Sequence, residues 1–303
     1  MLCNIHTGQW DDKLLKILDI PKNILPEIKS SSEVYGFVDC MGVRIPISGI
    51  AGDQQAALFG QCCFSEGDAK NTYGTGCFLL ANIGKTPIMS QNGLLTTIIA
   101  GEKGREIEYA LEGSVFVGGA VVKWLRDEMK MIHESGDSEF FARKVKDSGG
   151  VYFVPAFSGL GAPHWDMEAR GTIVGLTAGT GKNHIIRGAL ESIAYQTEDV
   201  ISAMNEDMAL FGEEPINCLK VDGGASANDL LMQMQSDISG ISVMCFSSAE
   251  ATALGAAFLA GLGVGFFKDR EELKEKITAG KVFECSKTKA EREKMLKGWQ
   301  KAV

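Results

Sequence analysis

Hydrophobic and polar positions alternate along the chain with two periods, and each period predicts one kind of element. Apolar residues three or four positions apart predict helices, whereas short apolar runs between Gly, Pro or Asn predict strands. Residues 11–30 have the first pattern, and we expect a short helix there that ends at Pro21. Residues 34–52 have the second pattern and predict a hairpin whose last strand, around 45–50, is buried.

The next stretch predicts a helix followed by consecutive strands. Residues 54–59 predict a helix for which Asp53 is the N-cap. Residues 68–100 predict a strand, a turn and a second strand, and 106–113 predict a third. A helix is then expected from about residue 115 to residue 133.

The second half of the chain alternates helices with strands. Residues 151–180 predict two short strands joined by a loop rich in Gly, Pro and aromatic residues, and a long helix is expected over 182–208. A buried strand then breaks at Gly223 and Gly224, and helical sequence resumes at Asn228. The remaining expected elements are a strand over 242–246, a helix over 251–265, and helices that begin near Arg270 and Thr288. This order predicts an α/β fold with a mixed sheet flanked by helices.

Composition places the chain among globular proteins and argues against two classes of partner. Hydrophobic residues make up 45% of the 303, which is enough apolar surface to order the bulk of the chain. Lys and Arg number 30 against 39 Asp and Glu, and the net charge of −9 argues against a nucleic-acid binder. No apolar stretch is long enough to span a membrane, and the N-terminus has no signal-peptide pattern. We therefore expect no nucleic-acid partner and no membrane partner.

Cysteine and histidine positions give no sign of a metal site. The eight cysteines are scattered, without Cys-x-x-Cys or Cys/His ligand spacing. Several lie in apolar runs, as buried thiols do in a reducing compartment, and we expect a cytoplasmic protein. The four histidines are far apart in sequence and are expected to be surface or packing residues: His6, His133, His164 and His184.

The strongest local signal for a ligand is the segment VDGGASAN at 221–228. A strand that stops at Asp222 is followed by two glycines, and a helix starts near Asn228. Glycines let the backbone approach a ligand without a Cβ in the way, and the N–H groups of the helix face the same crevice. The pattern indicates a nucleotide site at the carboxyl end of a strand, although an ordinary strand–turn–helix corner has the same pattern.

Two further segments are candidates. The turn at 73–76 offers its N–H groups and the Thr75 hydroxyl to a phosphate, or is a plain hairpin turn. Asp53, just past a buried strand, is placed to accept a proton from a substrate hydroxyl or to hold Mg²⁺, or is only an N-cap. The string GTGK at 179–182 is no Walker A loop, because Leu176 stands where the upstream glycine is required.

Three strings in this order resemble the FGGY family of carbohydrate kinases: IAGDQQAALFGQ at 50–61, NTYGTGCF at 71–78 and VDGGASAN at 221–228. GTIVGLTAGTGKNHIIRGALESIAYQ at 171–196 resembles a further signature of that family. The likeness covers nearly the whole chain and favours members that phosphorylate glycerol over those that phosphorylate pentoses. It implies the actin-like, ribonuclease H-like ATPase fold and ATP-dependent conversion of glycerol to sn-glycerol 3-phosphate with Mg²⁺.

The resemblance also implies roles for individual residues. Asp53 would be the catalytic base on the glycerol hydroxyl and a Mg²⁺ ligand, and Gln54 and Phe78 would contact glycerol. The residues implied in ATP binding are Thr75, Gly119, Lys123, Gly224 and Asn228. The family often has Gln at the position of Lys123, where a cation is suited to phosphate.

The first domain of the family begins with a phosphate-binding strand–turn segment that this sequence does not contain. The resemblance therefore implies the C-terminal portion of such a kinase. Residues 1–60 would be the last part of the first, glycerol-side domain, and 61–303 the second, nucleotide-side domain. The implied partners are glycerol, ATP and ADP, and the full-length enzyme is expected to be a homo-oligomer. Two alternatives stay open, a non-catalytic nucleotide-binding module and a related kinase for a pentose or another polyol.

Overall fold

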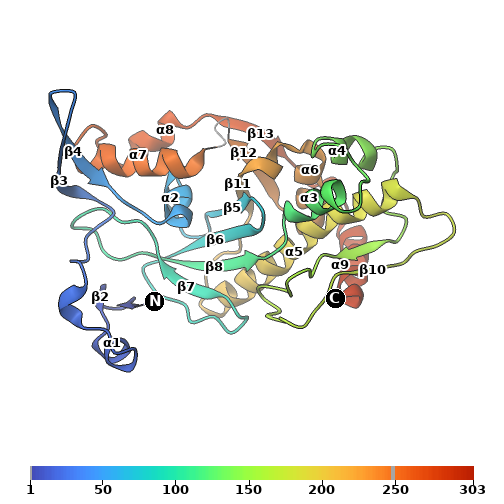
Figure 1. Cartoon of the computed structure of the whole chain (residues 1–303), viewed down its shortest axis with the longest axis horizontal. Helices are drawn as coiled ribbons and strands as arrows, with labels where there is room; N and C mark the ends of the chain where they lie inside the picture. Colours follow the sequence, from blue (N-terminus) through green and yellow to red (C-terminus); the bar gives the residue numbers. More distant parts are fainter. Residues whose placement is uncertain (1, 247–249) are drawn as a thin grey trace.

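The structure, a computed structural model, describes residues 2–246 and 250–303. In this part of the chain a seven-stranded sheet forms the centre, and its strands lie in the order β13-β12-β11-β5-β6-β8-β7 (Figure 1). The bounds of its strands are β5 Ala69–Tyr73, β6 Cys77–Gly84, β7 Leu95–Ile98, β8 Tyr109–Val115, β11 Cys218–Asp222, β12 Ser242–Phe246 and β13 Ala279–Phe283.

The sheet is mixed, as predicted, with its parallel part in the middle. β11 pairs in parallel with both β5 and β12, whereas β6, β7, β8 and β13 pair antiparallel with their neighbours. The register places Asp222 of β11 opposite Thr72 of β5. Because parallel strands run the same way, the carboxyl ends of β5 and β11 meet at one edge of the sheet, where α/β folds bind ligands.

Helices cover both faces of the sheet, and the side chains of β5 alternate between them. Asn71 donates a hydrogen bond to Thr197 of the long helix α5. Tyr73 donates one to Gln235 of α6 on the same side. Lys70, between them in sequence, contacts α2 on the opposite side. The helices with their bounds are α1 Asp12–Ile17, α2 Asp53–Gly60, α3 Ala120–Asp127, α4 Asp137–Ala142, α5 Lys182–Leu210, α6 Asp229–Ser239, α7 Ala251–Gly263, α8 Arg270–Lys276 and α9 Lys289–Ala302, with the 3₁₀ turns η1 Lys22–Ile24 and η2 Gly224–Ala227.

Six short or peripheral strands complete the described chain, and they form three antiparallel pairs. β1 Cys3–Asn4 pairs with β2 Gln9–Trp10, and β9 Tyr152–Val154 pairs with β10 Thr172–Val174, the pair expected in 151–180. β3 Ser32–Cys40 and β4 Val43–Gly49 form the expected hairpin.

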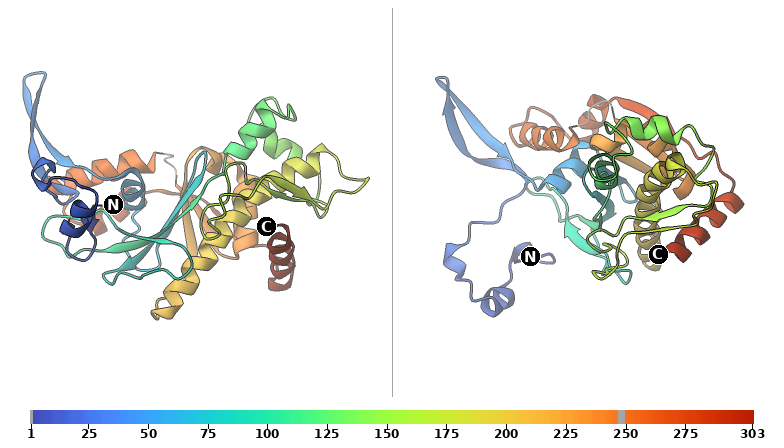
Figure 2. Two further views of the ribbon diagram at one scale, coloured as in Figure 1. Left: turned by 60° about the horizontal axis from the view of Figure 1, so that its bottom comes forward. Right: turned by 45° about the vertical axis from the view of Figure 1, so that its right-hand side comes forward.

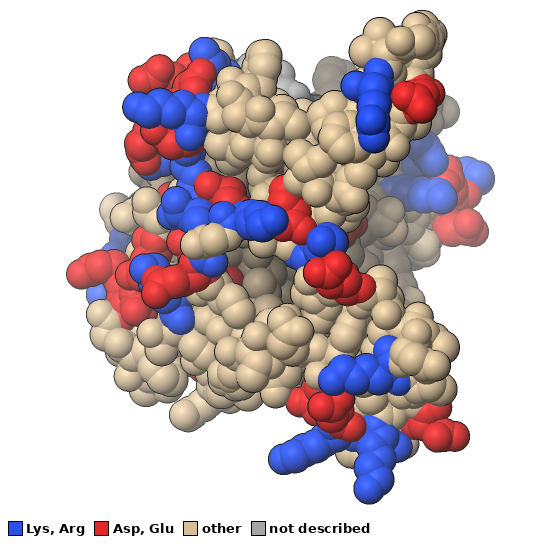
Figure 3. Space-filling model, turned by 90° about the vertical axis from the view of Figure 1, so that its left-hand side faces the viewer, with Lys and Arg blue, Asp and Glu red and all other residues tan. Residues whose placement is uncertain are grey.

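The expectation of a buried strand around 45–50 is wrong. Ile45, Ile47 and Ile50 are exposed, because among the described residues β4 pairs with β3 alone and the hairpin projects from the body (Figures 1 and 2). The base of the hairpin is attached to α7, where Ser32 and Ser48 donate hydrogen bonds to carbonyls of that helix. Figure 3 shows this side of the molecule, on which Lys and Arg alternate with Asp and Glu around large uncharged areas.

Two predictions about helix ends also need correction. Gly52, not Asp53, is the N-cap of α2, and Asp53 is the first residue of the helix. The helix expected over about 115–133 is confined to α3, Ala120–Asp127. β8 extends to Val115 and a turn follows it, because the N–H groups of Gly118 and Gly119 donate to carbonyls of the β5–β6 turn instead of starting a helix.

Helices α2 and α7 lie in direct backbone contact, which requires glycine on both. A Cβ on Gly255 of α7 would lie 1.8 Å from the carbonyl oxygen of Ala56, and one on Gly60 of α2 would lie 2.1 Å from that of Ala251. Real Cβ atoms never approach so closely, so either added methyl group would push the helices apart. The contact fixes α2, which carries Asp53 at its N-terminus.

Lys70 is a fully buried charge between β5 and α2. Its ammonium group donates to the side-chain oxygen of Gln54 and, at 3.0 Å, to the hydroxyl of Thr72. Burial lowers the pKa of Lys70 to about 8, although the carboxylates of Asp222 and Glu112 oppose the shift. The helix N-terminus and the strand are therefore joined through one cation.

All eight cysteines are free thiols in the structure. Burial raises the pKa of the Cys62, Cys63 and Cys77 thiols to about 12, so these thiols stay protonated at neutral pH. Among the described residues, no helix combines the length and the apolar character needed to cross a bilayer.

We expect Gly255→Ala to lower the free energy of unfolding by about 2–3 kcal/mol, because the new methyl group must displace the backbone of α2. The better helix propensity of Ala offsets only part of this loss. Urea unfolding checks the result, with Gly36→Ala as the control, since a Cβ on Gly36 would meet nothing within 4 Å. Equal stability of the two variants would contradict the tight packing of α2 on α7.

A second prediction concerns the pH dependence of stability. The folded-state pKa of Lys70 is about 8 and its ordinary value is 10.5, so the unfolded chain binds more protons between these values. The stability of the wild type relative to Lys70→Met should therefore rise by about 3 kcal/mol as the pH increases through this window. Urea unfolding at several pH values measures the difference. The exposed Lys146→Met is the control and should follow the wild type, whereas a pH-independent difference for Lys70→Met would refute the prediction.

Candidate functional site

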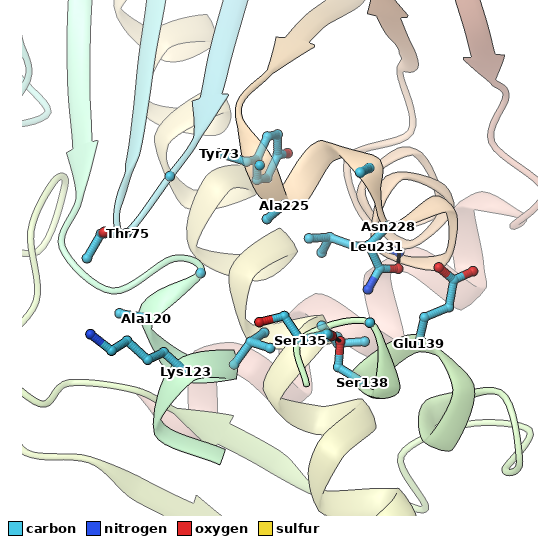
Figure 4. Close-up of a pocket in the computed structure, with 17 residues that line it drawn as sticks. Tyr73, Thr75, Ala120, Lys123, Ser135, Ser138, Glu139, Ala225, Asn228 and Leu231 are labelled. Carbon is cyan, nitrogen blue, oxygen red and sulfur yellow. Dashed lines mark hydrogen bonds between the residues drawn. The ribbon is translucent and has the colours of Figure 1, made fainter. Parts of the chain in front are cut away.

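A cavity of about 530 Å³ opens at the carboxyl edge of β5 and β11. Its volume lies in the range of small-molecule sites. Figure 4 shows that η2 and α6 border it on one side and α3 and α4 on the other. The residues that line it are Tyr73, Gly74, Thr75, Gly119, Ala120, Val122, Lys123, Ser135, Gly136, Ser138, Glu139, Leu190, Gly224, Ala225, Ala227, Asn228 and Leu231.

The two glycines after β11 have different tasks. Gly223 has φ +89°, and a Cβ there would lie 2.5 Å from the carbonyl oxygen of Tyr73. Only glycine fits, because both the left-handed backbone and the close approach to β5 exclude a side chain. A Cβ on Gly224 would meet no protein atom within 4 Å. Since Gly224 lines the cavity, its missing side chain leaves room for a ligand.

Asn228 joins this turn to α6 as the N-cap of the helix. Its Oδ1 accepts a hydrogen bond of 2.9 Å from the backbone N–H of Leu231. The oxygen is therefore held by the helix, and the Nδ2 group is the polar atom that Asn228 directs into the cavity (Figure 4). The same residue thus ends the turn and presents a donor to a ligand.

The turn at 73–76 connects β5 and β6 as a β-hairpin turn. The Gly74 N–H donates to the Gly76 carbonyl at 2.9 Å and is not directed to a ligand. The Thr75 and Gly74 carbonyls accept bonds of 2.8 Å from Gly118 and Gly119, which draws the start of α3 against the turn. Thr75 and Lys123 consequently lie at the same end of the cavity (Figure 4).

Asp53, Gln54 and Phe78 lie outside this cavity, in a second polar group beside β5. Oδ1 of Asp53 accepts the backbone N–H of Gln54 at 2.9 Å, and the Gln54 side chain accepts from Lys70. Phe78, about one-third exposed, stands opposite Thr72 in the β5–β6 register. A carboxylate, an amide and an aromatic ring are thereby gathered near the end of one strand.

Three carboxylates act on the charge of the Lys70 ammonium group without an ion pair to it among the described residues. Asp53, Glu112 and Asp222 each favour its charged form. Burial raises the pKa of Glu112 and of Asp222, while a hydrogen bond from Thr72 lowers that of Asp222. The row Asp222–Thr72–Phe78 crosses three neighbouring strands, so the polar group adjoins the edge where the cavity opens.

The structure thus divides the residues predicted for the site into two groups. All five residues assigned to ATP line one cavity: Thr75, Gly119, Lys123, Gly224 and Asn228. Of the residues assigned to glycerol, Asp53 and Gln54 are the first two residues of α2, and Asp53 is exposed. Phe78 lies on β6, opposite Thr72 of β5.

Sequence reasoning missed Lys70 and the cavity wall from Ser135 to Glu139. A lysine inside the otherwise uncharged strand AKNTY was a visible signal, because buried charges require partners. The wall had no such signal, since it approaches β5 only through the packing of α4 on α5 and α6.

The described residues contain no group of three or more His, Cys, Asp or Glu side chains that could hold a metal ion. Mg²⁺ takes one or two carboxylates, with water and substrate phosphates as its other ligands. The exposed carboxylate of Asp53 and the buried Oδ1 of Asp222, which has no hydrogen-bond partner, fit this requirement.

The chain is similar to curated kinases over its whole length. It is 59% identical to the glycerol kinase of Clostridium perfringens strain 13 over 306 aligned residues, with 100% of this chain and 60% of the relative covered. It is also 59% identical to the glycerol kinase of Fusobacterium nucleatum, covering 61% of that protein. The chain therefore spans about 60% of the length of these relatives.

Solved structures share the fold. The crystal structure of Plasmodium falciparum glycerol kinase with ADP matches with a TM-score of 0.93 and 40% identity, over 100% of this chain and 60% of that one. The xylulose kinase of Lactobacillus acidophilus matches with a TM-score of 0.85 at 23% identity, over 99% of this chain and 61% of that one, which is a likeness of fold alone. The predicted actin-like ATPase fold is confirmed.

Family profiles match two consecutive parts of the chain. The profile of the FGGY carbohydrate kinases, N-terminal domain, matches residues 1–60, and that of their C-terminal domain matches residues 69–264. The second match alone covers more than half of the sequence. The chain belongs to the FGGY family of carbohydrate kinases.

Proposed function

We propose that the chain forms the nucleotide-binding part of a kinase that transfers the γ-phosphoryl group of ATP to glycerol. The observation that carries this proposal is the cavity at the β5–β11 edge, which collects all five residues assigned to ATP. The 59% identity to glycerol kinases supports glycerol as the acceptor. The Plasmodium relative with ADP supports an adenine nucleotide as the donor.

At the nucleotide, each residue has a task that suits its chemistry. The Thr75 hydroxyl and the Lys123 ammonium group bind phosphate oxygens at one end of the cavity, where Gly119 leaves the backbone accessible. Gly224 leaves space for the ribose, and Asn228 donates from Nδ2 to the base. Positioning and charge stabilisation of this kind supply most of the catalysis in phosphoryl transfer.

At the acceptor, Asp53 is the general base. Its exposed carboxylate accepts the proton of the attacking glycerol hydroxyl as the new O–P bond forms and the bond to ADP breaks. Gln54, held by Lys70, orients a second hydroxyl, and Phe78 packs on the carbon backbone of glycerol. Lys70 is therefore a positioning residue, because it acts on the substrate through Gln54.

Mg²⁺ is the proposed cofactor, with Asp53 as a protein ligand. When bound, this ion neutralises phosphate charge. The absence of a larger carboxylate cluster among the described residues agrees with an ion whose remaining ligands are phosphate oxygens and water.

The domain division and the location are also proposals. We assign residues 1–60 to the glycerol-side domain and 61–303 to the nucleotide-side domain, supported by the two family profiles. Eight free thiols support a reducing compartment, such as the cytoplasm.

We expect Gly224→Val to weaken ADP binding at least about tenfold, because a branched side chain would fill the space beside the ribose. Its free energy of unfolding should not change, since no protein atom lies within 4 Å of the added Cβ. Calorimetry with ADP and urea unfolding measure the two quantities. Gly101→Val, at a second open position outside the cavity, is the matched control, and equal ADP affinity in both variants would contradict the site.

The activity is tested with Asp53→Asn, which keeps the size of the side chain and removes the base. We expect kcat to fall by about 10²–10⁴ while ADP affinity is retained. Glycerol-dependent ADP release is measured for this chain alone and for the chain joined to the residues of the Clostridium perfringens relative that it does not cover. Robust turnover that survives the substitution would rule out Asp53 as the base.

The same assay separates the two alternatives. ADP binding without glycerol-dependent turnover in either protein would favour a non-catalytic nucleotide-binding module. If turnover with a pentose or another polyol exceeds turnover with glycerol, the same residues phosphorylate a different acceptor.

A further inference from the structure

Glu139 places a carboxylate at the edge of the nucleotide cavity and holds it in one orientation. Its Oε1 accepts two hydrogen bonds from Arg143 one helical turn later, at 2.8 Å from Nε and 2.5 Å from Nη2. Because both bonds go to Oε1, Oε2 remains the carboxylate oxygen that can accept a hydrogen bond from a ligand. The side chain is 27% exposed and lines the cavity, so a ligand in the cavity can reach it.

Glu139 lies at the same end of the cavity as Asn228, away from Thr75 and Lys123 (Figure 4). Asn228 offers a donor there, because its Oδ1 is held by Leu231. One wall therefore presents a fixed acceptor and another presents a fixed donor, at the end opposite the phosphate-binding groups.

Both apolar and hydroxyl side chains line the rest of the cavity. Leu190, Ala225 and Leu231 suit the faces of a flat aromatic ring, and Ser135 and Ser138 add polar atoms on the side of α4. A nucleotide whose phosphates lie near Thr75 and Lys123 consequently places its base among them. The polar edge of that base meets Glu139 and Asn228.

We propose that Glu139 determines base selectivity: Oε2 accepts a hydrogen bond from the exocyclic amino group of a 6-aminopurine, and so discriminates against 6-oxopurines. The inference rests on the proposed nucleotide site and assigns its preference to one residue. An ionised carboxylate can only accept, so a 6-oxo group would bring two acceptors face to face. Guanine can also donate two parallel N–H groups to a carboxylate, but that pairing needs both carboxylate oxygens. Arg143 already occupies Oε1 of Glu139, so guanine gains little binding free energy from it.

The probes are ADP and inosine diphosphate, which differ at position 6 and the adjoining ring nitrogen of the base. We expect the wild-type chain to bind ADP more tightly by about tenfold or more, as hydrogen bonds to charged groups are worth this much. In Glu139→Gln the amide oxygen stays on Arg143 and the amide NH₂ turns into the cavity. The ratio of the two affinities should then fall at least about tenfold, mostly through weaker ADP binding.

Two further variants make the test specific. Glu134→Gln is the matched control, the same substitution on an exposed residue of the same connection that does not line the cavity, and it should keep the wild-type ratio. Glu139→Ala removes the acceptor without adding a donor and should give an intermediate ratio. Circular dichroism and urea unfolding establish that each variant is folded.

The outcomes separate this inference from the proposed function. Wild-type binding of ADP with an unchanged ratio in Glu139→Gln would overturn the role of Glu139 and leave the nucleotide site standing. Failure of the wild-type chain to bind ADP or inosine diphosphate would overturn both. A ratio that falls in Glu139→Gln and stays in Glu134→Gln would support the assignment.

Discussion

The parallel pairing of β5 with β11 is the constraint on which the rest of the structure depends. These strands are far apart in sequence, yet their register sets Thr72 beside Asp222. Both strands therefore end at the same edge of the sheet. The turn at 73–76 and the segment from Gly223 to α6 must then share that edge. Their closest approach, at the Tyr73 carbonyl, admits no side chain on Gly223. The cavity lies beside this close contact between the two segments, at the edge that they share.

A buried cation connects the cavity edge to the N-terminus of α2. Lys70 lies inside the sheet, and the free energy of burying its charge requires oxygen atoms around it. Gln54 and Thr72 supply them directly, and three carboxylates supply a favourable field. Through Gln54 the cation holds the beginning of α2, and the contact of Gly60 and Gly255 holds the rest of that helix. Asp53 is therefore exposed on a backbone that cannot easily move.

Much of the fold was predictable because its elements have strong local patterns. The strands before Gly223, the long α5 and the N-cap Asn228 all follow from periodicity and helix-cap chemistry. The hairpin at 32–49 shows the limit of such reasoning. Its apolar alternation predicts a strand equally well whether or not another element covers it, and in the structure none of the described residues covers its tip. The prediction of Asp53 as the N-cap of α2 was wrong for a related reason, since Gly52 and Asp53 are both residue types that suit the start of a helix.

The sequence by itself determined the family, the strand–turn–helix corner at 221–228 and the identity of the residues with suitable chemistry. These properties are local, because a glycine, a carboxylate or a capping amide has the same chemistry wherever the chain places it. Only the tertiary structure decided which of them meet. It joined Thr75, Lys123 and Asn228 in one cavity, separated Asp53 into a second group, and brought in Lys70 and Glu139. Contacts of this kind depend on strand register and helix packing between segments that are far apart in sequence. Register and packing are in turn determined by the free energy of the whole core.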